Sequence, residues 1–142
     1  MIRYQDEELT HNIIAAAIEV HKTLGPGLLE SAYKTCLLME FEEMGLNYKQ
    51  ELMTPIVYRN KRIDCGFRID VLVEDKIVLE LKSVEHILPV HEAQILTYLR
   101  LLGRQVGLLI NFNVSVLKKG IRRCVLDAHE VALGEIPDWA KP

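Results

Sequence analysis

The chain has 142 residues, of which 49% are apolar and 26% charged, with a net charge of −3. This composition is typical of one globular domain and excludes a disordered or low-complexity chain. The acidic balance argues against binding nucleic acid through overall positive charge. No apolar run approaches the roughly 18 residues of a membrane span, and the start MIRYQDEELT lacks the apolar core of a signal peptide. We therefore expect a cytoplasmic protein without a membrane partner.

Charge and cysteines are unevenly placed. Residues 1–51 carry 4 Lys or Arg against 9 Asp or Glu, whereas residues 52–142 carry 13 against 11. Any basic surface must therefore be local, and the candidates are RNKR (59–62) and KKGIRR (118–123), either of which could equally be a solvated turn. Wide spacing of the cysteines predicts reduced, buried thiols and indicates neither a disulfide framework nor a CxxC zinc site: Cys36, Cys65 and Cys124.

Two amphipathic helices are predicted first. Helical spacing of apolar residues runs from about Leu9 to Leu24, with Thr10 as N-cap, and Gly25-Pro26-Gly27 ends the helix. A second helix is predicted from about Leu29 to Met44, before Gly45. The residues expected to face inward are Ile13, Ile14, Ala17, Ile18, His21 and Leu24 in the first helix, and Leu29, Ala32, Tyr33, Cys36, Leu37 and Phe41 in the second.

The pattern changes to that of strands after Gly45. Alternation predicts strands near 48–58, 63–73 and 77–83, joined as antiparallel hairpins by RNKR and EDK. Pro55 indicates an edge strand or a bulge. Further predictions are a third helix at His91–Leu102, a buried strand at 106–112 (VGLLINF), a last strand at Ile121–Asp127 and an irregular tail, GEIPDWAKP. The order ααβββαββ predicts an α/β or α+β fold in a single domain, residues 1–142.

The most informative stretch is RIDVLVEDKIVLELKS, residues 68–83. If residues 74–76 form a three-residue loop, Asp70 lies directly opposite Glu80 in the hairpin. A two-residue turn would instead place Asp70 opposite Leu79. With the first register, alternation forms one aliphatic face from Ile69, Val71, Val73, Ile77, Leu79 and Leu81, and a second face from Arg68, Asp70, Leu72, Val78, Glu80 and Lys82.

Opposed carboxylates suggest a cation site. Two like charges directly across a hairpin are destabilising, and a bound divalent cation would remove that penalty. Mg²⁺ takes hard oxygen ligands, often one or two carboxylates with water and phosphate. Lys82 points the same way as Glu80 and can meet a scissile phosphate or an attacking water. The alternative is a half-solvated hairpin, which the apolar Leu72 and Val78 on the same face weaken.

Three motifs carry a family resemblance. Asp70, followed after nine residues by Glu80-Leu81-Lys82, resembles the signature of the PD-(D/E)XK nuclease superfamily, although Ile69 stands where that signature has proline. Gln94 and Tyr98 resemble the QxxxY element of its RecB-like and CRISPR-associated exonuclease branches. The stretch from Gly27 through Glu30 to Tyr33 resembles the motif of the small bacterial GxxExxY proteins, which are placed in this superfamily. The flanking sequence fits that family along nearly the whole chain.

The resemblance implies a restriction-endonuclease-like core, a mixed β-sheet flanked by helices. It also implies hydrolysis of phosphodiester bonds in nucleic acid with Mg²⁺ or Mn²⁺, with DNA favoured over RNA. Asp70, Glu80 and Lys82 are then the catalytic residues. The implied metal ligands are Asp70, Glu80, Glu30 and the backbone carbonyl of Leu81, and the implied supporting residues are Glu30, Tyr33, Gln94 and Tyr98.

Simpler roles exist for several of these residues. The helix dipole alone favours a first-turn carboxylate such as Glu30. Gln94 and Tyr98 share a helix face, and a helix-to-sheet hydrogen bond and a core aromatic are favoured for them over direct catalysis. We expect Gly27 to supply an unusual backbone conformation. His21 fits a satisfied core histidine, while His86 and His91 flank the loop after the strand at 77–83.

Two functions remain open at this stage. One is a metal-dependent nuclease, and the other is a catalytically silent nuclease-fold module that binds nucleic acid or assembles with proteins. The acidic charge and short chain favour the second, and intact Asp70, Glu80 and Lys82 oppose it. A homodimer would help so small a protein span a duplex. The sequence does not distinguish an endonuclease from an exonuclease, and it does not indicate a sequence preference.

Overall fold

The computed structural model describes residues 6–127. Three α-helices, five strands and one 3₁₀ helix follow one another as α1 (Glu7–Leu24), α2 (Glu30–Met44), β1 (Tyr48–Tyr58), β2 (Lys61–Val73), β3 (Ile77–Lys82), α3 (Pro89–Leu102), β4 (Val106–Asn111), η1 (Leu117–Gly120) and β5 (Ile121–Val125). The predicted order ααβββαββ is confirmed, with η1 as an additional short helix. The predicted irregular tail, GEIPDWAKP, lies outside the described residues.

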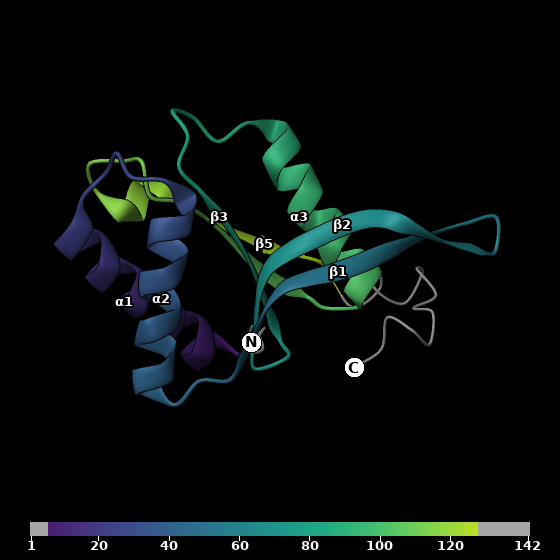
Figure 1. Cartoon of the computed structure of the whole chain (residues 1–142), viewed down its shortest axis with the longest axis horizontal. Coiled ribbons are helices and arrows are strands. Elements are labelled where there is room, and N and C mark those ends of the chain that lie inside the picture. Colours follow the sequence, from purple (N-terminus) through teal and green to yellow (C-terminus); the bar gives the residue numbers. More distant parts are fainter. Residues whose placement is uncertain (1–5, 128–142) are drawn as a thin grey trace.

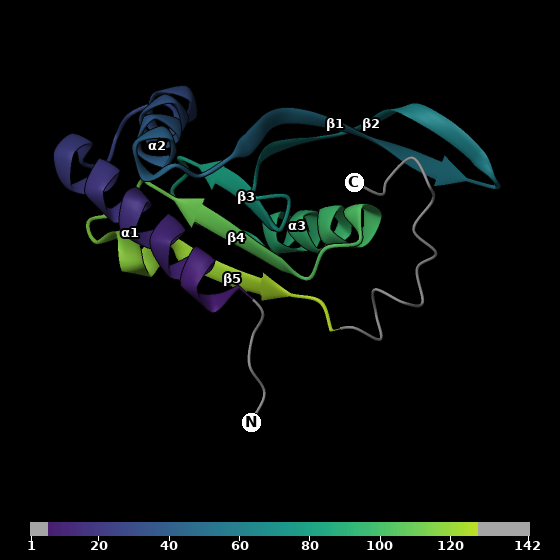
Figure 2. The same cartoon turned by 90° about the horizontal axis from the view of Figure 1, so that it is seen from below.

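The strands form one mixed sheet in the order β1-β2-β3-β4-β5. Only β3 and β4 run parallel, and α3 makes the connection between them. The other neighbours are antiparallel. Helices α1 and α2 cover one face of the sheet and α3 covers the other (Figures 1 and 2). The predicted mixed α/β fold is therefore confirmed.

Each sheet face has its own hydrophobic core. Residues of α1 and α2 pack against one face of β2, β3 and β4, and α3 packs against the opposite face. The strand β4 is buried along its whole length, as expected for a strand covered on both sides. A Cβ at Gly107 of this strand would lie 2.8 Å from Ile95 Cδ1, so glycine allows α3 to pack closely on the sheet.

The hairpin between β2 and β3 has the predicted loop. Lys76 N–H donates to the Val73 carbonyl at 2.9 Å, which closes a turn over residues 74–76. Val73 pairs with Ile77, Leu72 with Val78 and Val71 with Leu79. The register with a three-residue loop is thus confirmed, and the alternative two-residue turn is wrong.

Pro55 has both predicted consequences. Strand β1 lies at the edge of the sheet, and its register with β2 shifts between Thr54 and Ile56. An edge position and a bulge both accommodate a residue that has no backbone N–H. The turn between β1 and β2 consists of Arg59 and Asn60, both with positive φ (50° and 64°).

Two expectations about the helices need correction. Asp6, not Thr10, is the N-cap residue of α1, and Thr10 lies inside the helix with its hydroxyl donating to the Asp6 carbonyl. Leu29 is 78% exposed and does not face the core, because α2 begins only at Glu30 and Leu29 has extended backbone.

Among residues 6–127, no helix is long and apolar enough to span a bilayer.

The segment that joins α1 to α2 is held by one tyrosine. Tyr33 is fully buried, stacks on Phe112 at 4.4 Å and donates its hydroxyl proton to the Gly25 carbonyl at 2.6 Å. The Tyr33 hydroxyl oxygen also accepts the Leu28 N–H at 3.1 Å. Gly27 has φ of 98°, a conformation that other residues resist. The spacing from Gly27 to Tyr33 therefore has a structural reason.

We predict that Tyr33→Phe lowers the free energy of unfolding by about 1–3 kcal/mol, because the Gly25 carbonyl and the Leu28 N–H lose their shared partner. Urea denaturation measures the change. Tyr48→Phe is the control, since the Tyr48 hydroxyl donates to exposed Glu42 at the surface, and its effect should stay within about 0.5 kcal/mol. Equal losses in the two variants would contradict the role assigned to the Tyr33 hydroxyl.

Candidate active site

Asp70 and Glu80 meet where β2 and β3 separate. The backbone hydrogen bonds between β2 and β3 end at the pair Val71–Leu79. At the next position, the carboxylates of Asp70 and Glu80 accept the backbone N–H groups instead. Asp70 N–H donates to Glu80 Oε1 at 3.2 Å, and Leu81 N–H donates to Asp70 Oδ2 at 2.8 Å. Each carboxylate therefore accepts a backbone N–H of the opposite strand, and the two acids are held side by side.

The expected alternation of side chains breaks at Asp70. Ile69, predicted to join the aliphatic face of Val71, packs instead in the core beneath α3. Glu51, opposite Asp70 in β1, has a left-handed φ of 53°, which marks the point where the β1–β2 pair twists away from the sheet. As a result, Asp70 turns toward α2. It does not share a sheet face with Leu72, although the sequence predicted that it would.

The surroundings of Glu80 disfavour its charge. The residue is only 6% exposed. Burial and then repulsion from the Asp70 carboxylate raise the pKa of Glu80 to about 8, although the Asp70 N–H and the charge of Lys82 act in the opposite direction. Within residues 6–127, neither carboxylate forms an ion pair with Lys or Arg. The pair is thus short of positive charge.

Lys82 and Tyr98 border the acidic pair. Lys82 is half-buried at the end of β3, close enough for its charge to act on Glu80. Tyr98 is buried beneath the sheet, with its ring 5.1 Å from that of Phe67, so the expected core aromatic is confirmed. Burial and the charges of Glu80 and Asp70 raise the pKa of Tyr98 to about 12. Its hydroxyl therefore stays protonated beside the acids.

Gln94 does not make the helix-to-sheet hydrogen bond that was expected. It lies one turn before Tyr98 on α3 and is half-buried. In the part of the chain that the structure describes, its amide has no hydrogen-bond partner. The amide is therefore available to a bound molecule.

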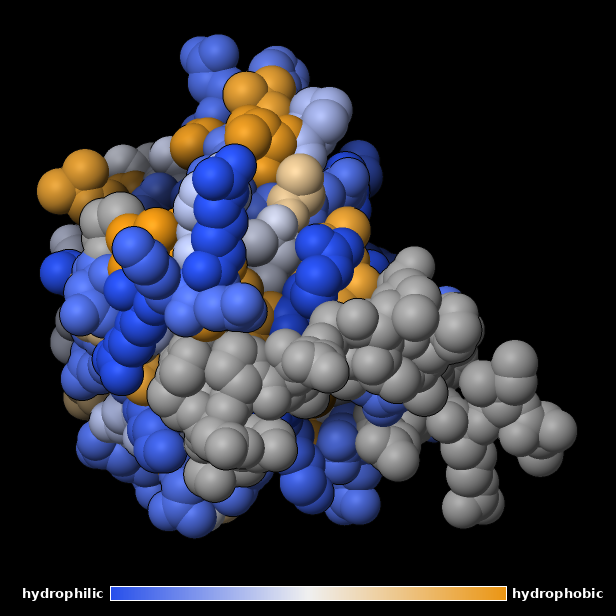
Figure 3. All heavy atoms as spheres, turned by 90° about the vertical axis from the view of Figure 1, so that its right-hand side faces the viewer, coloured by the Kyte–Doolittle hydropathy of each residue, from blue (hydrophilic) through white to orange (hydrophobic). Residues whose placement is uncertain are grey.

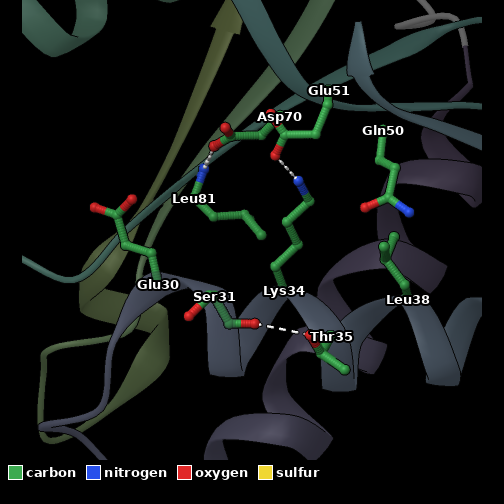
Figure 4. A pocket seen from close by; sticks show the side chains of 9 residues that line it. All are labelled: Glu30, Ser31, Lys34, Thr35, Leu38, Gln50, Glu51, Asp70 and Leu81. Atoms are coloured by element: carbon green, nitrogen blue, oxygen red, sulfur yellow. Dashed lines mark hydrogen bonds and ion pairs between the residues drawn. The ribbon is translucent and has the colours of Figure 1, made fainter.

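A hollow of about 360 Å³ opens between α2 and the sheet beside Asp70 (Figure 4). Its wall on α2 includes Glu30 and Lys34, and its floor includes Asp70 and Leu81. Glu30 is exposed at the first turn of α2, on the side of the hollow where Asp70 bonds to Leu81. Glu30 therefore shares the hollow with Asp70, as its motif position suggested.

The hollow also contains an ion-pair network that the sequence did not predict. Lys34, with a side chain only 14% exposed, pairs with Glu51 Oε1, and Glu51 Oε2 accepts from Arg68 Nη1 at 3.2 Å. The hydrogen bond from Lys34 is the main reason that the pKa of Glu51 is lowered. No motif marks these residues, because they lie on three separate elements. Gln50 also lines the hollow.

Asn111 was missed as well, although an amide inside the apolar run VGLLINF was a usable signal. Asn111 is 2% exposed and clamps the segment after β3: it donates to the Val84 carbonyl at 2.9 Å and accepts the Val84 N–H at 3.0 Å. Ser83 donates its hydroxyl proton to the Leu28 carbonyl at 2.6 Å. These bonds fix the chain directly after Lys82.

Two of the histidines considered above, His21 and His91, make hydrogen bonds to the backbone. His21 is buried and its Nε2 lies 2.7 Å from the Val114 carbonyl, as expected for a satisfied core histidine. His91 Nδ1 accepts the Leu88 N–H at the start of α3. His86 is exposed. Cys36 and Cys124 are free thiols, half-buried and buried respectively, while the side chain of Cys65 is not described.

The oxygen donors fit a hard divalent cation. Leu81 N–H points to Asp70, and the N–H and C=O of one strand residue leave by the same edge, so the Leu81 carbonyl also faces the gap beside the acids. Two carboxylates and one carbonyl suit Mg²⁺, which keeps several waters. Among residues 6–127, however, no group of three or more His, Cys, Asp or Glu lies close enough to hold a metal. The implied third carboxylate, Glu30, is thus not gathered with Asp70 and Glu80.

Comparison with known proteins agrees with this geometry. The model of the PD-(D/E)XK nuclease superfamily matches residues 7–124. The chain therefore belongs to this superfamily, whose fold is the mixed sheet flanked by helices described above. Searches of the curated proteins and of the solved structures found no match to this chain.

We predict that Glu80→Gln stabilises the protein in the absence of divalent metal. The folded-state pKa of about 8 lies above the ordinary value of 4.5, so the wild type loses stability as the pH rises from about 4.5 to about 8, and the variant avoids this loss. The difference should be near zero at low pH and on the order of 3 kcal/mol near pH 7.

Denaturation in urea with chelator at several pH values measures the Glu80→Gln effect. Glu85→Gln is the matched control, because Glu85 is exposed, and it should follow the wild type. A Glu80→Gln difference that does not grow with pH would refute the assigned cause.

Proposed function

We propose that the protein is a metal-dependent nuclease that hydrolyses phosphodiester bonds, with DNA favoured over RNA. The observation that carries the proposal is the contact between half-buried Asp70 and buried Glu80, which form no ion pair with Lys or Arg among residues 6–127. Maintaining two such groups in contact costs stability, and a bound divalent cation offsets that cost. Superfamily membership supports the same function.

In this proposal Asp70, Glu80 and the Leu81 carbonyl hold Mg²⁺ or Mn²⁺. The ion, when bound, polarises the phosphate and lowers the pKa of its bound water. Lys82 follows Glu80 by two residues in β3, so its ammonium faces the same phosphate and stabilises developing negative charge. Glu30 lines the hollow beside Asp70, and Gln94 lies one turn before Tyr98 on α3; we assign both to the orientation of water or substrate. Tyr33 and Tyr98 act through structure, by fixing the α1–α2 connection and filling the core under the acids.

We also propose that the chain is a GxxExxY protein. The support is the role of each motif residue: Gly27 has a positive φ, Tyr33 binds the loop through its hydroxyl, and Glu30 lines the hollow beside Asp70. A catalytically silent module is the second candidate. The acidic overall charge favours it, and the separation of Glu30 from the acidic pair is consistent with it.

We predict that Mg²⁺ or Mn²⁺ binds one site that requires Asp70. Calorimetric titration of the wild type should give saturable binding, and Asp70→Asn should abolish it, because a neutral amide cannot supply the carboxylate charge. Asp64→Asn is the control, since Asp64 is exposed on β2 and pairs with Arg62. Identical binding by the wild type and Asp70→Asn would exclude the proposed metal site.

We predict that Lys82→Ala suppresses cleavage while metal binding stays largely intact. An ammonium cannot ligate a cation, but loss of one group that stabilises the transition state commonly lowers the rate by about 10²–10³. The assay compares the wild type, Lys82→Ala and Glu80→Gln on single-stranded DNA, duplex DNA and RNA, with metal and with chelator.

Two results would count against the nuclease. Equal residual cleavage by all three proteins would indicate a contaminating enzyme. Folded, metal-loaded wild type that cleaves none of the substrates would favour the silent module.

A further inference from the structure

The outer parts of β1 and β2 form a two-stranded arm, defined here as residues 52–69. Strand β2 pairs with β3 only from Val71 to Val73, so the strand residues before Ile69 pair with β1 alone. Figures 1 and 2 show this arm reaching away from α1, α2 and the rest of the sheet. Only its base packs on α3, where the Phe67 ring contacts Tyr98. A long exposed ribbon needs a reason beyond core packing.

The arm is basic in an acidic protein. It carries four Lys or Arg and one Asp, whereas the whole chain has a net charge of −3. The basic side chains are exposed: Arg68 to 62% and Arg62 to 57%, with Arg59 and Lys61 at the tip. Tyr58 is 59% exposed and lies under the Arg59 guanidinium, 5.4 Å from ring centre to Cζ. Figure 3 faces the tip end and shows long hydrophilic side chains standing out from it.

One face of the arm continues from the candidate active site. The pair Met53–Arg68 lies two residues beyond Glu51 and Asp70 toward the tip of the arm, and Arg68 is bonded to Glu51 at the rim of the hollow. The tip residue Lys61 lies nine residues from Asp70 along β2. At about 3.3 Å per residue this gives a reach of up to roughly 30 Å, close to one turn of duplex DNA.

The arm is poorly suited to pairing with a strand of a second copy. Its outer edge carries Pro55, which cannot donate to a ladder, and a bulge beside it. Charged residues lie at the tip and along the β2 strand of the arm, at Arg59, Lys61, Arg62, Asp64 and Arg68. Proline, bulges and charge are the devices by which proteins prevent strand addition at an edge.

We propose that the arm binds duplex DNA, with Arg59 and Lys61 contacting phosphates about one helical turn from the scissile bond. A two-stranded ribbon fits the major groove, and the basic side chains match the charge of the backbone. The inference rests on the proposed nuclease function, because it assigns the arm to the same substrate. It explains how a protein of negative net charge holds a polyanion.

The test uses the full chain with Asp70→Asn as background, so that binding is measured without cleavage. Fluorescence anisotropy follows binding to a duplex of roughly three helical turns over a series of salt concentrations. Adding Arg59→Gln with Lys61→Gln should weaken binding about tenfold and reduce the salt slope by about 2, because two phosphate contacts are lost.

A matched control removes the same charge elsewhere. Lys118 and Lys119 are exposed on η1, at the opposite end of the molecule from the arm in Figures 1 and 2. Lys118→Gln with Lys119→Gln should leave the affinity within about twofold and the salt slope unchanged. Equal losses in the two double variants would overturn the proposal, as would tighter binding to single-stranded DNA than to duplex.

The outcome also separates the arm from the nuclease function. Wild type that binds duplex through the arm but cleaves nothing with metal supports the arm and rejects the nuclease. Wild type that cleaves with metal, together with arm variants that bind and cleave like the control, rejects the arm and leaves the nuclease intact.

Discussion

The candidate site depends on the exchange of backbone hydrogen bonds for side-chain hydrogen bonds where β2 leaves β3. A strand edge that opens inside a protein exposes N–H groups that must find partners. Here the Asp70 and Glu80 carboxylates accept the N–H groups of Leu81 and Asp70. The same bonds that close the gap bring two negative charges together, so the local solution for the backbone creates the electrostatic conflict at the site.

The elements around this gap keep it rigid. Tyr33 stacks on Phe112 and ties the segment before α2, while Ser83 connects that segment to the end of β3. Asn111 holds the following residues through Val84. Lys82 therefore stands in a chain segment that is bonded from two directions. Precise placement of a charged group at low conformational freedom is what transition-state stabilisation requires.

Much of this arrangement follows from local sequence. The three-residue loop at 74–76, the edge position of β1 and the buried β4 were predictable because turn chemistry, proline and apolar runs act over a few residues. Ile69 was assigned to the wrong core, because alternation fails where Glu51 takes a left-handed φ, and nothing in the sequence marks that twist. The pairing of Lys34 with Glu51 joins two elements and could not be read from either one alone.

The chain order also has a consequence for folding. The acids Asp70 and Glu80 are ten residues apart within one hairpin, a local contact that closes a short loop at low entropic cost. The parallel pair β3–β4 must wait for the crossover through α3. The acidic pair can thus meet before α3 covers it with Tyr98, and Glu80 becomes buried only when α3 docks. The free-energy cost of burying Glu80 beside Asp70 therefore arises when α3 docks. A cation present during folding should speed that docking step more than the early closure of the hairpin.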